Sequence, residues 1–221
     1  MYWSVNSNFF DMLMPMATHT EVRPNRRGVK SRELVLDAAE RVMAEHGFEA
    51  ATLARVVEEA GIPLSSVYHY YGSKEGILLA VMERGAEHFF ADLPESGRRV
   101  GRAKDYLTTV ISTAADTLER HPSFLRLLIV FAAQPVAVAG GEVQDVVGRV
   151  RALGVQRLQR EIALAFDDDP DSATTIHLAR FALAAFDGAF IATQADRSLR
   201  LSELLAPLAP AMIAARRALL R

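Results

Sequence analysis

The chain has 221 residues and is 50% hydrophobic, so it can bury a sizeable core in one or two domains. Its formal net charge is −2, and the absence of cysteine excludes disulfides, thiol nucleophiles and thiolate metal sites and favours the reducing cytoplasm. No apolar run approaches the roughly 20 residues of a membrane span, so we expect no membrane partner.

The first segment, residues 1–23, is predicted to be a disordered tail. It lacks the charged start of a signal peptide, and Asp11 interrupts its apolar portion. A basic run without acidic residues begins at its end and consists of Arg23, Arg26, Arg27, Lys30 and Arg32. One basic arm on a weakly acidic protein favours local contact with nucleic acid over general coating of it.

The first helix is predicted from about Gly28 or Ser31 to His46. Gly47 suits the left-handed residue that follows a helix, and Phe48 can then pack back onto the last turn. The apolar residues of this segment recur at helical spacing and are Val35, Ala38, Ala39, Val42 and Met43. They predict an amphipathic helix with one face in a core.

Residues 52–74 are predicted to form a helix, a tight turn and a second helix. Thr52 is a good N-cap, and Gly61 suits the left-handed end of the first helix. The second helix places Val67 and Tyr71 four residues apart on its buried side. Its other side is polar and carries no acid: Ser65, Ser66, Tyr68 and His69. This arrangement is typical of a helix-turn-helix that presents a hydrogen-bonding face to DNA.

Residues 32–82 resemble the N-terminal domain of the tetracycline-repressor (TetR) family of bacterial transcription regulators. Besides the stripe of the first helix, the matching positions are Gly47-Phe48, Thr52, Ala60-Gly61-Ile62, Val67-Tyr68-His69-Tyr70-Tyr71, Ser73-Lys74-Glu75, Leu78 and Val81. They agree in order and spacing over about a quarter of the chain. The rest resembles the family only in being helical and of the right length.

The resemblance implies an all-α fold of about nine helices. Residues 24–75 would form a three-helix, helix-turn-helix DNA-binding domain, and residues 76–221 a helical domain that binds an effector and dimerises. By resemblance, the DNA contacts fall on Thr52, Ser65, Ser66, Tyr68, His69 and Lys74. Thr52 would direct a helix N-terminus at phosphate, Tyr68 and Lys74 would hold phosphates, and the other three would read base edges.

The turn departs from the family pattern. Pro63-Leu64-Ser65 stands where the family usually has Ser-Lys-Gly, so Leu64 replaces a cationic contact. Leu64 can instead meet a thymine methyl group, which would make part of the readout apolar.

The remaining chain is predicted to be helical. Ser73 can cap a long helix that ends near Leu93, and Ser202 can cap the last helix, which Pro207 and Pro210 should bend. Between them we expect helices at about 104–120, 122–131, 142–166 and 172–196.

Several residues of these helices are candidates for an effector pocket implied by the resemblance. The apolar ones are Met82, Phe89, Phe124, Phe131, Phe181 and Phe190, and the polar ones are His121, His177 and Asp187. Aromatic stripes at helical spacing also occur in plain cores, so both interpretations stay open.

Helix 172–196 is rich in small residues, which are Ala182, Ala184, Ala185, Gly188, Ala189 and Ala192. They permit close approach of another helix. The resemblance implies a homodimer in which this helix and the last one form a four-helix bundle with their copies. The alternative is a helix buried within one subunit.

No enzyme signature is present. The six histidines lack ligand spacing, and GxGxxG, P-loop and GxSxG patterns are absent, so we expect no metal, cofactor or catalytic residue. The predicted function is a ligand-responsive, sequence-specific DNA-binding regulator, a homodimeric repressor released from a palindromic operator by a small molecule. The alternatives are an all-α enzyme or small-ligand carrier without DNA binding, and a constitutive architectural DNA protein.

Overall fold

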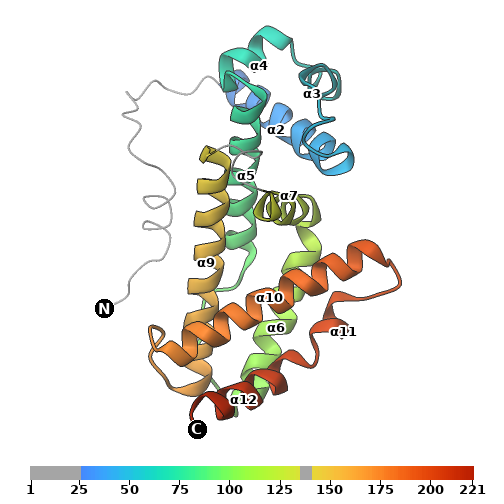
Figure 1. Ribbon diagram of the computed structural model, residues 1–221. Coiled ribbons are helices and arrows are strands. Elements are labelled where there is room, and N and C mark those ends of the chain that lie inside the picture. The colour runs from blue at the N-terminus through green and yellow to red at the C-terminus, as the bar shows by residue number, and fades with distance from the viewer. Residues whose placement is uncertain (1–25, 135–140) are drawn as a thin grey trace, which may run out of the picture.

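The computed structural model describes residues 26–134 and 141–221 (Figure 1). The tail expected at residues 1–23, and Arg23 of the basic run, lie outside these ranges. The helices in chain order are α2 (Arg26–His46), α3 (Leu53–Ala60), α4 (Leu64–Tyr71), α5 (Lys74–Asp92), α6 (Ala103–Arg120), α7 (Pro122–Ala133), α9 (Gly141–Phe166), α10 (Ala173–Ala195), α11 (Leu201–Leu205) and α12 (Leu208–Leu219). The described residues contain no strand, so the all-α prediction is confirmed.

Helices α2, α3 and α4 form a small unit at one end of the molecule (Figure 1). The Thr52 hydroxyl accepts a hydrogen bond from the Arg55 backbone N–H at 3.3 Å, which begins α3 as the cap motif predicts. Gly61 ends α3 at φ 64°, and its N–H donates to the Val57 carbonyl at 2.9 Å. Local capping therefore fixes both ends of the first helix of the helix-turn-helix.

Helix α5 connects this unit to the rest of the protein. Ser73 caps it by accepting from the Gly76 N–H at 3.1 Å, and Glu75 lies in its first turn. The domain boundary expected between residues 75 and 76 thus falls inside one continuous helix. At Gly85, α7 comes so close that a Cβ would lie 2.4 Å from Cδ2 of Phe124.

In the larger unit α6, α7 and α9 pack against α5, while α11 and α12 pack against α6 and α10 (Figure 1). Helix α10 packs most extensively against α9 and also contacts α11 and α12. By length and composition alone, α10 would be apolar enough to cross a membrane, so our expectation of no such segment was too strict. It buries Leu178, Phe186 and Phe190 against neighbouring helices, and a core helix meets the same test.

The last helix differs from the prediction. Ser202 does not cap it: α11 begins after Arg200, which makes no side-chain cap bond, and Ser202 is its second residue. The helix then divides, because Pro207 has no N–H to donate to the Glu203 carbonyl. That carbonyl accepts instead from the Ala206 N–H at 3.3 Å, and α12 starts at Leu208. This division makes ten described helices where about nine were expected.

Candidate functional site

The outer face of α4 is open. Leu64 and Tyr68 expose 43% and 51% of their surface, and Ser65 and His69 are exposed beside them. Val67, on the opposite side, is only 1% exposed and anchors α4 in the core. Pro63 precedes the helix without a side-chain cap bond, so the first N–H groups of α4 have no capping side chain. This face can therefore offer a hydroxyl, a phenol, an imidazole and an isobutyl group to a partner.

Lys74 points partly inward. Its Nζ donates to the Glu49 carbonyl at 3.2 Å and lies 4.2 Å from the centroid of the Phe48 ring. Phe48 in turn packs edge-on against Phe131 of α7 at 5.5 Å. Lys74 thus holds the α2–α3 connection against α5, and an ammonium has three donors, so it can also bind a phosphate from this position.

Two tyrosines at the end of α4 contact the start of α2. The Tyr71 hydroxyl donates to the Arg32 carbonyl at 3.1 Å, and the Arg32 guanidinium lies 5.2 Å from the Tyr70 ring centroid. Burial, followed by the negative charge of Glu33, raises the pKa of Tyr71 to about 12. The phenol therefore stays neutral and keeps its donor at physiological pH.

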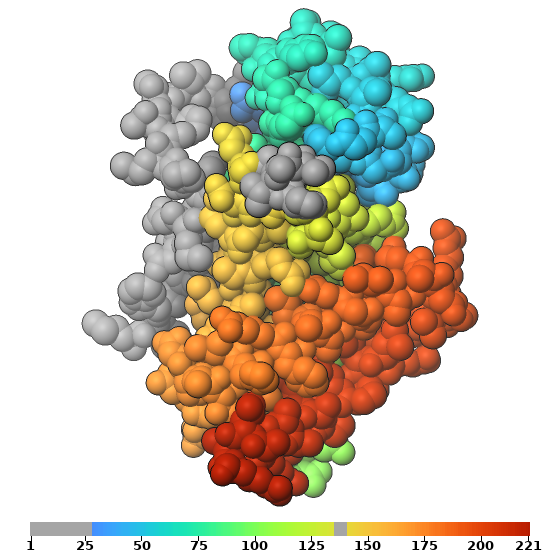
Figure 2. All heavy atoms as spheres, in the orientation of Figure 1, coloured from blue at the N-terminus to red at the C-terminus, as the bar shows by residue number. Residues whose placement is uncertain are grey.

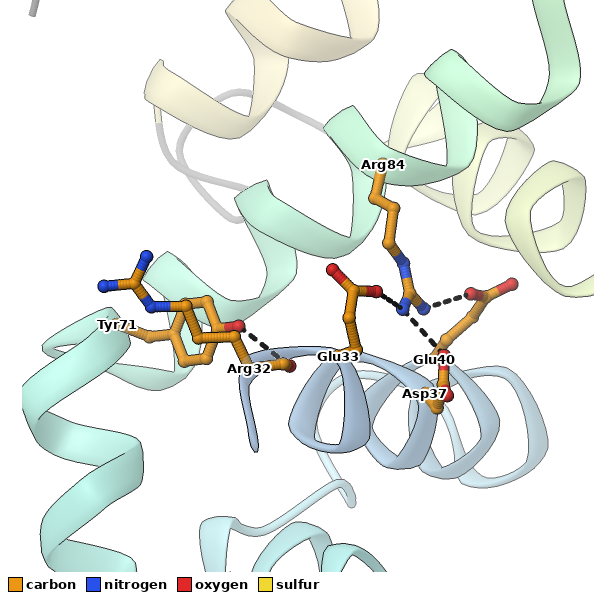
Figure 3. Close-up of polar contacts among 6 residues, drawn as sticks. All are labelled: Arg32, Glu33, Asp37, Glu40, Tyr71 and Arg84. Atoms are coloured by element: carbon orange, nitrogen blue, oxygen red, sulfur yellow. Dashed lines mark hydrogen bonds and ion pairs between the residues drawn. The ribbon is translucent and has the colours of Figure 1, made fainter. Parts of the chain in front are cut away.

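The middle of α5 is fastened to α2 by one arginine (Figure 3). Arg84 donates to Glu33 at 3.1 Å, Asp37 at 2.7 Å and Glu40 at 3.0 Å, and we refer to these four residues as the Arg84 clamp. Burial acts to lower the pKa of Arg84, but the hydrogen bonds with Asp37 and Glu33 raise it overall. Because the three carboxylates lie on one face of α2, a single guanidinium fixes the rotation of α2 relative to α5.

A second arginine connects three helices. Arg126 of α7 donates from Nη1 to the Ala44 carbonyl at 2.9 Å, near the C-terminus of α2. Its Nη2 donates to Oε1 of Gln194 on α10 at 2.7 Å. A movement of α10 can therefore reach the unit of α2, α3 and α4 through one side chain.

The larger unit contains a cavity of about 270 Å³ between α5, α6, α7, α9 and α10. Its apolar wall includes Phe89, Phe90, Leu125, Leu128, Leu158, Leu183, Phe186 and Phe190. It extends to the segment between α5 and α6, where the exposed Pro94, Glu95 and Gly97 contribute to the lining.

Two ion pairs line this cavity. Arg151 of α9 meets Asp187 of α10 at 2.6 Å, and Arg157 meets Glu161 one turn further along α9 at 3.2 Å. Glu161 is only 5% exposed and also accepts from the Tyr106 hydroxyl at 2.7 Å. Burial first, and the hydrogen bond with Glu161 second, raise the pKa of Tyr106.

The comparisons with known proteins decide the family. The sequence model of the bacterial regulatory proteins of the tetR family matches residues 35–81, which span most of α2, the helix-turn-helix and the start of α5. The HTH-type transcriptional repressor AcnR of Corynebacterium efficiens is 36% identical over 69 residues, which is 31% of this chain and 37% of that repressor. The chain thus matches just over a third of that relative's length.

Solved structures extend the likeness to the whole fold. A transcriptional regulator from Rhodococcus sp. Rha1 has a TM-score of 0.68 at 19% identity, over 83% of this chain and 96% of its own. The transcriptional regulator FadR of Bacillus subtilis has a TM-score of 0.63 at 17% identity, over 83% of this chain and 98% of its own. This chain belongs to the TetR family of transcriptional regulators. TetR-family regulators are not enzymes, which agrees with the expected function.

The residues predicted to bind DNA in this TetR-family chain lie near one another. Leu64, Ser65, Ser66, Tyr68 and His69 belong to α4, while Thr52 and Lys74 begin the helices before and after it. All are exposed except Ser66 and Lys74, which are half-buried. Their contacts with DNA stay a prediction.

The residues predicted for the effector pocket are divided between three places. Phe89, Asp187 and Phe190 line the cavity. Met82, Phe124 and Phe131 are at most 1% exposed and belong to the core, while His177 and Phe181 are exposed on α10. His121 lies behind the cavity wall, with its ring 5.8 Å from that of Phe89 and its Nε2 2.9 Å from Oδ2 of Asp92.

Sequence reasoning missed the polar part of the cavity. Arg151, Tyr106, Arg157 and Glu161 were not selected, although Arg157 and Glu161 share one helix face with the apolar Val150, Gly154 and Leu158. Charged residues four apart on an otherwise apolar face are a signal that could have found that pair. The clamp residue Arg84 gave no such signal, because its partners lie 44 to 51 residues away.

Proposed function

We propose that this chain is a homodimeric, ligand-responsive repressor that acts in the cytoplasm on a palindromic operator. One observation carries the proposal: α5 runs unbroken from Lys74, beside the helix-turn-helix, to Phe89 and Phe90 on the cavity wall. A ligand that displaces the far end of a rigid helix also displaces its near end.

DNA recognition rests on α4 and its surroundings. Leu64, Ser65, Ser66 and His69 would enter the major groove, and Tyr68, Lys74 and the N-terminus of α3 at Thr52 would contact phosphates. Supporting this, α4 exposes an acid-free face, and the named relative AcnR is a transcriptional repressor. We also propose residues 24–75 as the DNA-binding domain and residues 76–221 as the sensing and dimerising domain.

Ligand sensing rests on the mainly apolar cavity between α5, α6, α7, α9 and α10. FadR of Bacillus subtilis, which shares the fold, was solved in complex with stearoyl-CoA, so this fold accommodates a bound effector. A ligand that binds better to a conformer with mis-spaced α4 helices lowers operator affinity by its differential affinity for the two conformers.

Dimerisation rests on an unpartnered face of α10, which lies across the surface in Figure 2. We call it the α10 stripe. It consists of the exposed residues His177, Phe181, Ala184, Gly188, Ile191 and Ala195, which recur three and four positions apart. The pattern suits packing against a second helix, and the exposed Leu219 and Leu220 at the end of α12 enlarge the apolar area. A dimer would place two α4 helices to read successive major grooves about 34 Å apart.

The test is to isolate the genomic DNA that the purified protein enriches and to measure binding to it by fluorescence anisotropy. We expect an inverted repeat, and an affinity that falls steeply between roughly 50 and 200 mM salt as counterions are released. A protein that enriches no DNA, or binds it without salt dependence, would instead be a small-ligand carrier.

A further inference from the structure

Both arginines that line the cavity are paired with carboxylates that also line it. Arg151 holds Asp187 with Nη2 to Oδ2 at 2.6 Å and Nη1 to Oδ1 at 3.4 Å. Arg157 holds Glu161 at 3.2 Å and also donates to the Pro94 carbonyl. Each guanidinium is thus paired with a carboxylate, and the cavity presents no uncompensated positive charge to a ligand carboxylate or phosphate.

The carboxylates are equally occupied. Besides Arg157, Glu161 accepts from the Ser96 hydroxyl at 2.6 Å and from Tyr106 at 2.7 Å. Asp187 lies against Arg151, and both side chains keep about 30% of their surface accessible. An ammonium group therefore meets no uncompensated negative charge in the cavity, just as an anion meets no uncompensated positive charge.

Burial makes the binding free energy of a charged ligand less favourable than that of a neutral one. Removing one member of a partly buried pair leaves an uncompensated charge, which costs more than the pair itself contributes. A charged ligand either displaces one member at that cost or remains a third, uncompensated charge in a mainly apolar cavity, whereas a hydroxyl or carboxamide can bond to the edge of an intact Arg151–Asp187 pair. The remaining wall is mainly apolar and favours hydrocarbon.

The cavity volume limits the size of the ligand. An apolar cavity of about 150 Å³ holds benzene, which has six heavy atoms, so 270 Å³ corresponds to about eleven heavy atoms. We propose that this pocket selects an uncharged, mainly apolar molecule of this size with one hydrogen-bonding group, and that the Arg151–Asp187 pair reads this group and rejects ions. The proposal rests on the proposed ligand-sensing role and specifies its chemistry.

The experiment uses the full-length protein and four probes that share a ten-carbon chain: decan-1-ol, decanamide, decanoate and decylammonium. Affinities are measured near pH 7.5, without DNA, by displacement of the neutral dye Nile red and by calorimetry. We expect the alcohol and the amide to bind at least roughly tenfold more tightly than either ion, because one charged hydrogen bond lost or made corresponds to about this factor.

Two variants of the Arg151–Asp187 pair should each favour a different charged probe. D187N leaves Arg151 unpaired and should raise the affinity for decanoate roughly tenfold, while R151Q leaves Asp187 unpaired and should do the same for decylammonium. Decan-1-ol should weaken roughly threefold in both variants, because its hydroxyl no longer bonds to an intact pair, so the ion becomes the tighter ligand. E59Q removes the same charge from the exposed Arg41–Glu59 pair between α2 and α3 and is the matched control, for which all four affinities should stay unchanged.

The proposal is overturned if the wild type binds decanoate or decylammonium as tightly as the neutral probes, or if it binds neither neutral probe. It is also overturned if folded D187N and R151Q, checked by circular dichroism, keep the wild-type order of affinities. Failure of a bound neutral probe to release operator DNA would count against the proposed repressor function alone, since this binding assay contains no DNA.

Discussion

Arg84 Nη1 lies 2.7 Å from Asp37 Oδ1, so the middle of α5 is fastened to α2 by a charged hydrogen bond between residues 47 positions apart. Arg84 is only 11% exposed and serves two further acids, Glu33 and Glu40. The unit of α2, α3 and α4 is therefore held by the same helix that lines the cavity, and a displacement of α5 acts on α2 through this contact.

Loss of the Arg84 clamp should lower stability. R84Q leaves three carboxylates facing one another on α2, and we expect the free energy of unfolding to fall by about 1–3 kcal/mol. The matched variant R41Q breaks the exposed Arg41–Glu59 pair and should cost less than about 1 kcal/mol. Urea denaturation of both variants measures the difference, and equal losses would show that the clamp is no stronger than a surface pair.

Substitutions at Phe89 should alter ligand response. Phe89 lines the cavity and packs against Phe90 at 5.2 Å and Phe124 at 6.0 Å. F89A should change the affinity for Nile red and the ligand concentration that releases operator DNA, while operator affinity without ligand changes little. M82L is the control, because Met82 is fully buried on the same helix outside the cavity lining and the swap conserves volume. If F89A binds dye and releases DNA like the wild type, coupling must be sought through another contact, such as that of Arg126.

A bulky residue at Gly188 should separate the proposed dimer. A Cβ at Gly188 meets no atom within 4 Å in the single chain, so G188E fits the monomer but would occupy the space of a partner helix on the α10 stripe. We expect sedimentation equilibrium to give a monomer with unchanged helix content. Gly148 of α9 is also exposed and unobstructed, so G148E is the control and should remain dimeric. A dimeric G188E would move the interface away from this stripe.

Lys74 and His69 should affect DNA binding differently. K74A should weaken binding to operator and random DNA alike and make the salt dependence shallower, because a phosphate contact is sequence-independent. It should also cost about 1 kcal/mol of stability through loss of the Glu49 and Phe48 contacts. H69A should reduce mainly the preference for operator over random DNA. Anisotropy titrations with both DNAs at several salt concentrations distinguish the two effects, and an unchanged slope for K74A would remove Lys74 from the phosphate contacts.

Tyr71 should contribute to unfolding at alkaline pH. Its pKa in the folded state is about 12, above the ordinary value of 10, so its contribution is complete below pH 10 and is lost as the pH rises toward 12. Y71F should be less stable than the wild type at pH 7 by about 1 kcal/mol, since the bond to the Arg32 carbonyl is lost. The difference in free energy of unfolding between the wild type and Y71F, measured by urea denaturation, should become smaller above pH 10. If this difference in free energy of unfolding stayed constant from pH 7 to pH 11, a role for ionisation of the phenol would be contradicted.

The helix-turn-helix could be predicted from the sequence because its signals are local. The Thr52 cap acts on a residue three positions away, and Gly61 donates to a carbonyl four positions back. Such contacts depend only on backbone conformation within one or two turns, which residue type largely specifies. The same reasoning failed at Ser202, where the proline five residues later divided the helix and the start of α11 was decided elsewhere.

The candidate cavity and the coupling contacts were decided by tertiary structure alone. Arg151 meets Asp187 across 36 residues, Tyr106 meets Glu161 across 55, and Arg126 meets the Ala44 carbonyl across 82. Apolar periodicity tells which face of each helix is buried, but not the helix that this face meets. The crossing angle and axial offset of two helices determine which side chains touch, and these depend on the packing of all the other helices. For this reason local signals in the sequence predicted the helix-turn-helix and the polar face of its second helix, whereas only the packed structure separated Phe89, Asp187 and Phe190 on the cavity from Met82, Phe124 and Phe131 in the core.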